Sequence, residues 1–143
     1  MKNYIQYRRD LHAMPEVGRQ EHKTGQYIAD HLARLNCRLE RVVGTGSIAF
    51  FDNGTDEAIA FRADIDALPI AEETGLKFAS ANGCMHACGH DAHMAMLLAL
   101  ADYLNEHRAD YKKNVLLIFQ PSEETIGGAK PICESGVFER FHV

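Results

Sequence analysis

The chain is organised around the stretch Met85-His86-Ala87-Cys88-Gly89-His90-Asp91-Ala92-His93. This stretch combines a thiol, imidazoles and a carboxylate, and a nearly unbroken apolar run follows it from Ala92 to Leu104. The pattern predicts a loop that enters a buried helix, with Asp91 capping the helix start. Cys88 and His90 then lie on the loop, where an extended segment can direct both side chains to one point. Thiolate and imidazole are good ligands for divalent metals, so we interpret the stretch as a metal site; a buried cysteine beside surface histidines is the alternative.

A second polar cluster follows the next strongly apolar segment. Residues 114–119 are rich in branched and aromatic side chains and predict a buried strand. The strand runs directly into Gln120-Pro121-Ser122-Glu123-Glu124. Ligands collect at the carboxyl ends of strands in open α/β sheets. One glutamate can therefore bind a metal while the other takes a proton from an activated water, although a solvated acidic turn would look the same.

The first half of the chain predicts helices followed by strands. The third strand is short and apolar on both faces, so we expect it near the centre of the sheet, and Asp52-Asn53-Gly54 predicts a hairpin turn before it. The predicted helices cover residues 4–14 and 20–35, and the predicted strands cover residues 38–43, 47–51 and 58–61.

Several charged residues lie between these elements and the central stretch. Asp64 follows the third strand and could orient a metal ligand, or simply cap a turn. His12, near the end of the first helix, is expected to be structural rather than catalytic. Glu72 and Glu73 lie on a polar loop, and we expect solvent around them.

Composition excludes several classes of function. A net charge of −5 without a lysine or arginine cluster argues against nucleic-acid and anionic-membrane partners. No apolar run approaches the roughly 20 residues that span a bilayer, and no signal-peptide core follows the first residues. The scattered cysteines do not form a secreted disulfide framework, which favours a reducing cytoplasm; they are Cys37, Cys84, Cys88 and Cys133.

Four segments occur together in a recognisable order: Leu11-His12 with Pro15-Glu16, then Phe61 to Pro69, Met85 to His93, and Gln120 to Glu124. So arranged, they closely resemble the metal-dependent amidohydrolases, which include hippurate hydrolase, bacterial N-acyl-amino-acid amidohydrolases, N-acetyldiaminopimelate deacetylase and plant auxin-conjugate hydrolases. That family belongs with the co-catalytic metallopeptidases of the aminoacylase and glutamate-carboxypeptidase type. The resemblance covers essentially all 143 residues.

The resemblance implies a three-layer α/β catalytic domain. Its sheet would be mixed and largely parallel and would lie between helices on both faces. Residues 1–143 would be the N-terminal portion of that domain, without the inserted lid or dimerisation domain and without its C-terminal part. Two divalent metal ions are implied, manganese or zinc, with nickel as a further candidate. By resemblance the metal ligands are Cys88, His90 and Glu124 and the general base is Glu123, and we expect only supporting roles for Asp64, Asp66 and Asp91.

The implied activity is hydrolysis of the amide bond of N-acyl amino acids, for example acetyl or benzoyl derivatives. Glu123 would take the proton of an activated water and later deliver it to the leaving nitrogen. The alternatives are a metal-binding module and an inactive interaction fragment of such an enzyme; Glu123 argues against the first, because metal binding alone needs no base. Further ligand histidines are expected beyond Val143, so we expect the chain alone to be inactive, and an exposed sheet edge would favour a homo-oligomer.

Overall fold

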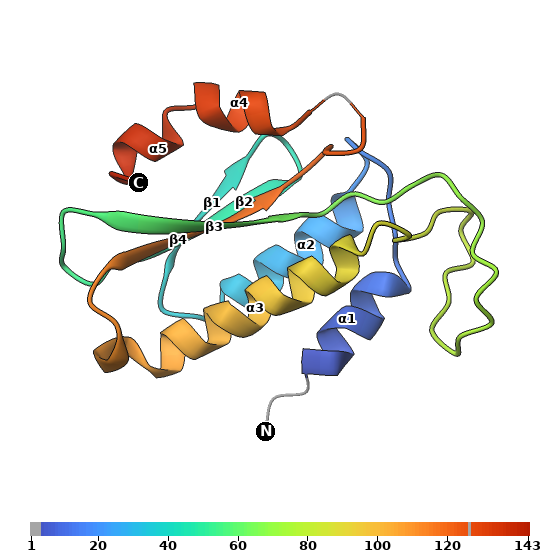
Figure 1. The fold of residues 1–143 in the computed structure, drawn as a ribbon, viewed down its shortest axis with the longest axis horizontal. Helices are drawn as coiled ribbons and strands as arrows, with labels where there is room; N and C mark the ends of the chain where they lie inside the picture. The colour runs from blue at the N-terminus through green and yellow to red at the C-terminus, as the bar shows by residue number, and fades with distance from the viewer. Residues whose placement is uncertain (1–3, 126) are drawn as a thin grey trace.

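The computed structural model describes residues 4–125 and 127–143. Figure 1 shows one sheet between two helical layers, with α1, α2 and α3 on one face and α4 and α5 on the other. The expected three-layer α/β architecture is therefore confirmed. In chain order the elements are α1 (Tyr4–His12), α2 (His22–Leu32), β1 (Arg38–Val42), β2 (Gly46–Phe51), β3 (Ala58–Asp64), α3 (His90–Glu106), the 3-10 helix η1 (Arg108–Asp110), β4 (Asn114–Gln120), α4 (Ala129–Glu134) and α5 (Val137–Arg140).

The sheet is mixed, with strand order β1-β2-β4-β3. β1 pairs with β2, and β2 with β4, in antiparallel orientation, whereas β3 and β4 are parallel. Only residues 43–45 separate β1 from β2, and so short a connection requires an antiparallel pair; the crossover through α3 makes β3 and β4 parallel. Parallel pairing was expected to dominate, but in the described part of the chain it is confined to this one pair.

The prediction that the third strand is central was wrong. β3 lies at one edge of the described sheet, and its Ile59 and Phe61 side chains are 48% and 44% exposed. β4 occupies the central position instead, because all of its residues are buried and need cover on both faces. For the same reason β2 and β3 do not form the predicted hairpin: Asp52 accepts a hydrogen bond from the Gly54 amide at 2.9 Å and turns the chain, but β4 lies between the two strands.

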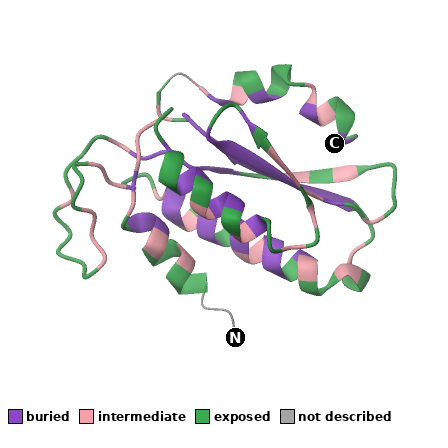
Figure 2. Ribbon diagram, turned by 180° about the vertical axis from the view of Figure 1, so that it is seen from behind, coloured by how far each residue is buried: buried purple, intermediate pink, exposed green. Residues whose placement is uncertain are grey.

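Alternate residues of β4 contribute to two separate cores. Val115, Leu117 and Phe119 pack with the side chains of α1, α2 and α3. Leu116 and Ile118 face the opposite way and pack with α4 and α5. Figure 2 shows the result, with buried strands in the centre and exposed outer helix faces. This period-two alternation gives the sheet an apolar surface on each side.

The segment between α1 and α2 fixes where the second helix begins. The helix starts at His22, two residues later than predicted, and Glu16 accepts hydrogen bonds from the amides of Lys23 at 3.2 Å and Thr24 at 2.9 Å. A carboxylate at a helix start satisfies amides that lack a partner within the helix and complements the helix dipole. None of the helices in the described ranges is long and apolar enough to cross a membrane.

Candidate metal centre

The first turn of α3 carries His90 at the carboxyl-terminal edge of the sheet. Gly89 precedes it with a φ of 85°, a left-handed conformation that favours glycine, and occupies the N-cap position without a side-chain capping bond. The prediction that Asp91 caps this helix was wrong. Asp91 lies inside the first turn, and its carboxylate bonds Arg8 and His12 instead.

His90 is 6% exposed, and the segment that follows β3 fixes the orientation of its ring. The ring Nδ1–H donates to the carbonyl oxygen of Asp66 at 2.9 Å, and the Asp66 carboxylate lies 3.6 Å from the same nitrogen. Hydrogen bonding to Asp66 is the main reason why the pKa of His90 is raised to about 9. Because a carbonyl can only accept, Nδ1 carries a proton in either charge state, and Nε2 is the atom that can bind a metal once its own proton has left.

The loop after β4 brings the two glutamates to the same place. Ser122 has a φ of 60°, and its carbonyl accepts hydrogen bonds from the amides of Gly127 at 3.0 Å and Gly128 at 3.2 Å. The Glu124 amide donates to the Asp66 carboxylate at 2.9 Å. Asp66 therefore contacts both halves of the site, His90 through its carbonyl and Glu124 through its carboxylate.

His90, Glu123 and Glu124 offer ligand atoms that all lie within 4.8 Å of one another. His90 Nε2 is 3.8 Å from Glu124 Oε1, which is longer than a hydrogen bond, so a cation can be bound by both atoms. Imidazole nitrogen and carboxylate oxygen are established ligands for zinc and suit manganese and nickel. The donor set of this chain therefore fits a divalent metal ion.

Cys88 lies at the rim of this group and is exposed. Its pKa is raised, chiefly because a hydrogen bond to the Glu124 carboxylate stabilises the protonated thiol. Its sulfur is not among the ligand atoms that converge within 4.8 Å. The structure thus brings together two of the three expected ligands, His90 and Glu124, with the expected base Glu123, and places Cys88 next to them.

Of the three aspartates for which a supporting role was expected, Asp66 is the one that lies behind His90. Asp64 pairs with Arg62 at 3.1 Å. Asp64 and Asp66 lie two residues apart at the end of β3, so strand alternation gives them the same face and cannot distinguish them. The distinction depends on α3, which brings His90 against Asp66.

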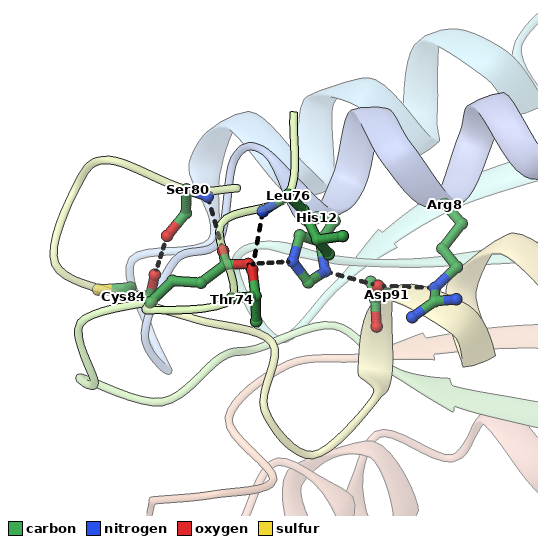
Figure 3. Close-up of polar contacts among 8 residues, drawn as sticks. Arg8, His12, Thr74, Leu76, Ser80, Cys84 and Asp91 are labelled. Carbon is green, nitrogen blue, oxygen red and sulfur yellow. Dashed lines mark hydrogen bonds and ion pairs between the residues drawn. The ribbon is translucent and has the colours of Figure 1, made fainter. Parts of the chain in front are cut away.

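A network of charged groups anchors the loop that leads to the metal centre (Figure 3). The His12 ring is 4% exposed and lies between two carboxylates, with Nδ1 2.9 Å from Asp91 and Nε2 3.0 Å from Glu72. Burial lowers the pKa of His12, but hydrogen bonds to Glu72 and Asp91 raise it more, and the net shift is upward. The structural role expected for His12 agrees with these contacts.

Glu72 was expected in solvent, and that prediction was wrong. Its side chain is fully covered and accepts hydrogen bonds from the Ser80 amide at 2.6 Å and from the Thr74 hydroxyl. Burial raises its pKa, but the bonds from Thr74, His12 and Ser80 outweigh this effect and bring the pKa to about 2. Glu72 is the centre around which residues 72–80 fold, a role that a polar-loop pattern does not reveal.

His86, the first histidine of the central stretch, is buried with no hydrogen-bond partner on either ring nitrogen in the described part of the chain. Burial is the main reason that its pKa is lowered to about 4. His86 is therefore neutral at physiological pH. It is not part of the group formed by His90, Glu123 and Glu124.

Comparison with known proteins identifies the family to which this sequence and fold are related. The sequence pattern of Peptidase family M20/M25/M40 matches residues 60–143. The chain is 45% identical to N-acetyldiaminopimelate deacetylase of Listeria monocytogenes serotype 4a (strain HCC23) over 99% of this chain. It is 44% identical to N-acetyldiaminopimelate deacetylase of Bacillus subtilis (strain 168), again over 99% of this chain. Each alignment covers 38% of the relative, so the chain spans well under half the length of these proteins.

Solved structures show the same relationship. The fold matches the Bacillus subtilis YXEP protein, described as a dinuclear metal-binding peptidase from the M20 family, with a TM-score of 0.88 and 46% identity. That match covers 94% of this chain and 39% of the other. An aminobenzoyl-glutamate utilization protein from Klebsiella pneumoniae matches with a TM-score of 0.73 and 25% identity, over 95% of this chain and 40% of its own length. The resemblance carried by the sequence motifs is thereby confirmed, and the chain belongs to peptidase family M20/M25/M40.

Proposed function

We propose that this chain carries the water-activating part of a metal-dependent amidohydrolase that acts on N-acyl amino acids. The observation that carries the proposal is the convergence of His90, Glu123 and Glu124 within 4.8 Å at the carboxyl ends of β3 and β4. Relatives named as N-acetyldiaminopimelate deacetylases support an N-acetylated amino acid as the substrate. A small-molecule substrate also agrees with the net charge of −5 and the absence of a basic cluster.

In this proposal Cys88, His90 and Glu124 would be the metal ligands of the chain, with Cys88 binding as the thiolate. The description of the YXEP protein as dinuclear supports two ions. Imidazole, carboxylate and thiolate together suit several divalent ions, and we propose manganese or zinc, with nickel as a further candidate. Asp66 holds His90 and Glu124 in register, and hydrogen bonding to a ligand histidine raises its basicity and fixes its tautomer.

When bound, the metal ions supply Lewis-acid activation of water and of the amide carbonyl. Glu123 follows the strained Ser122 turn, lies next to a ligand and is itself exposed to incoming water. It accepts a proton from the attacking water as the carbon–oxygen bond forms. It then gives that proton to the nitrogen as the carbon–nitrogen bond breaks, so the products are a carboxylate and a free amino acid.

A chimera tests the proposal, since the relatives are longer than this chain. The chain would replace the matching part of the Bacillus subtilis deacetylase, with which it aligns over 99% of its length. We expect the chimera to bind metal and to hydrolyse N-acetyldiaminopimelate. The variant Glu123→Gln should keep its metal content and lose about 10²–10⁴-fold in rate, as expected for loss of a general base.

Glu134→Gln is the matched control, because Glu134 is an exposed carboxylate on α4 away from the site. It should leave the rate unchanged. A folded, metal-loaded chimera that hydrolyses no N-acyl amino acid would contradict the proposed activity. Retention of about a tenth or more of the rate by Glu123→Gln would remove Glu123 from the mechanism.

We also propose that the protein works in the cytoplasm. All four cysteines are free thiols, and two of them, Cys88 and Cys133, are exposed. Exposed thiols persist in a reducing compartment and are oxidised elsewhere. Fractionation of the source cells with an antibody against the chain would test this assignment.

A further inference from the structure

Glu21 is a buried carboxylate whose hydrogen bonds join distant parts of the chain. It lies immediately before α2 and is 0% exposed. One carboxylate oxygen accepts a hydrogen bond from the Thr45 hydroxyl at 2.8 Å. The other accepts one from the Ser122 amide at 2.8 Å, with the Ser122 hydroxyl 3.4 Å away. A buried carboxylate is unfavourable unless donors surround it, so these contacts are what stabilise a charge at this position.

Ser122 has an unusual backbone conformation. Its φ of 60° is left-handed, which residues with a side chain rarely adopt without support from their surroundings. Both backbone polar groups of Ser122 are engaged, the amide by Glu21 and the carbonyl by the amides of Gly127 and Gly128. The turn at Ser122 sets the direction in which the chain continues to Glu123 and Glu124.

The segment before α2 packs closely against this loop. A Cβ atom added at Gly18 would lie 2.5 Å from the Thr125 hydroxyl oxygen and 3.1 Å from the Ser122 Cα. Glu21 therefore belongs to a surface that supports the whole loop. On the other side of the loop, the Asp66 carboxylate accepts a hydrogen bond from the Glu124 amide at 2.9 Å.

We propose that Glu21 is a positioning residue for the metal centre: its carboxylate holds Ser122 in the left-handed turn that directs Glu123 and Glu124 toward His90. The proposal rests on the ligand and base roles proposed above. Asp66 fixes the loop at Glu124, and Glu21 fixes it at Ser122. With both contacts the glutamates have one orientation, and without Glu21 the turn can relax away from its left-handed conformation.

The chemistry of the contacts predicts which substitutions are tolerated. Glu21→Gln keeps a carbonyl oxygen for the Ser122 amide, and its amide group can face Thr45, whose hydroxyl can also accept. Glu21→Leu removes both acceptors. Glu21→Asp keeps the charge but is one methylene too short to reach both partners. Thr45→Val is the matched control, because it removes the other hydrogen bond of Glu21 and leaves the Ser122 contact in place.

The readouts are made on the 143-residue chain by NMR, without metal. Exchange of the Ser122 amide with solvent reports its bond to Glu21, and nuclear Overhauser contacts between the His90 ring and the Glu124 side chain report the direction of the loop. We expect Glu21→Leu to speed Ser122 exchange about 10–100-fold, the weight of one hydrogen bond to a charged group, and to lose the His90–Glu124 contact. Glu21→Gln and Thr45→Val should retain both signals.

Unchanged Ser122 exchange and an unchanged His90–Glu124 contact in Glu21→Leu would overturn the proposal. If Glu21→Leu does not fold, Glu21→Ala decides, because it also removes both acceptors: wild-type protection of the Ser122 amide in that variant would overturn the proposal equally. If Glu21→Gln lost as much Ser122 protection as Glu21→Leu, the proposal would also be contradicted. The proposal holds that the oxygen that accepts the Ser122 amide matters, and not the negative charge of Glu21. Cobalt titration of the chimera keeps the two proposals apart, because a chimera that binds no cobalt, while the 143-residue chain shows the ordered loop, would contradict the ligand assignment alone.

Discussion

Replacing His12 by glutamine removes the buried cation that joins α1 to the first turn of α3 and to the loop around Glu72. Removing one partner of a buried ion pair costs about 3–5 kcal/mol. In this variant Asp91 keeps its ion pair with Arg8 at 3.0 Å, and Glu72 keeps its hydrogen bond from the Ser80 amide at 2.6 Å, so both carboxylates retain a donor. We therefore expect the lower end of that range, about 3 kcal/mol, in the free energy of unfolding at pH 6.

The effect should depend on pH with a definite sign. The folded-state pKa of His12 is raised above its ordinary value, so its stabilisation is complete below about pH 6.5 and is lost as pH rises through the folded pKa. Above pH 6.5 the advantage of wild type over His12→Gln should shrink by at most about 1.4 kcal/mol per pH unit, the limit for one proton. Asp91 and Glu72 have lowered pKa values, so they stay ionised throughout this range.

Urea unfolding followed by circular dichroism from pH 5.5 to 9 would measure the difference. His90 also has a raised pKa, but it titrates in both proteins, so the difference between them isolates His12. His107→Gln is the matched control, because His107 is an exposed histidine paired with Asp110 at 3.2 Å. It should change stability by less than about 0.5 kcal/mol. A gap between wild type and His12→Gln that is constant from pH 6 to 9 would refute a charged His12.

Three further predictions concern the metal centre and the sheet edge. Asp66→Ala should lower the free energy of unfolding by about 1.5–3 kcal/mol, because the Glu124 amide loses its acceptor, and should weaken cobalt binding about 10–100-fold. Asp66→Asn should cause smaller losses of both quantities, measured by urea unfolding and cobalt titration. Cys88→Ser should abolish the thiolate-to-metal absorption of the cobalt form, and an unchanged spectrum would count against Cys88 as a ligand. The chain should self-associate through the open β3 edge in sedimentation experiments; Phe61→Lys should weaken this association, while Tyr103→Lys, at a similarly exposed residue on α3, should not.

The local elements of this fold could be predicted from the sequence because their causes are local. The apolar run of β4 requires burial on both faces, and the apolar run after His90 requires a packed helix, wherever the rest of the chain lies. The residues of the metal centre could be selected for a similar reason. His90 lies at the start of α3 and Glu124 lies just after β4, two elements that pack together, and Glu123 is next to Glu124 in the chain.

The tertiary structure decided how the strands are ordered and which contacts support the residues of the metal centre. β3 lies at the edge and β4 lies between β2 and β3, because the strands compete for the central position. The residue pattern of one strand alone does not decide that competition. Glu21 and Ser122 are 101 residues apart, so no spacing in the sequence connects them. Glu72 looks like a surface residue until α1 brings His12 against it. A buried charge is stable only where donors from other segments meet it, and those meetings exist only in the folded chain.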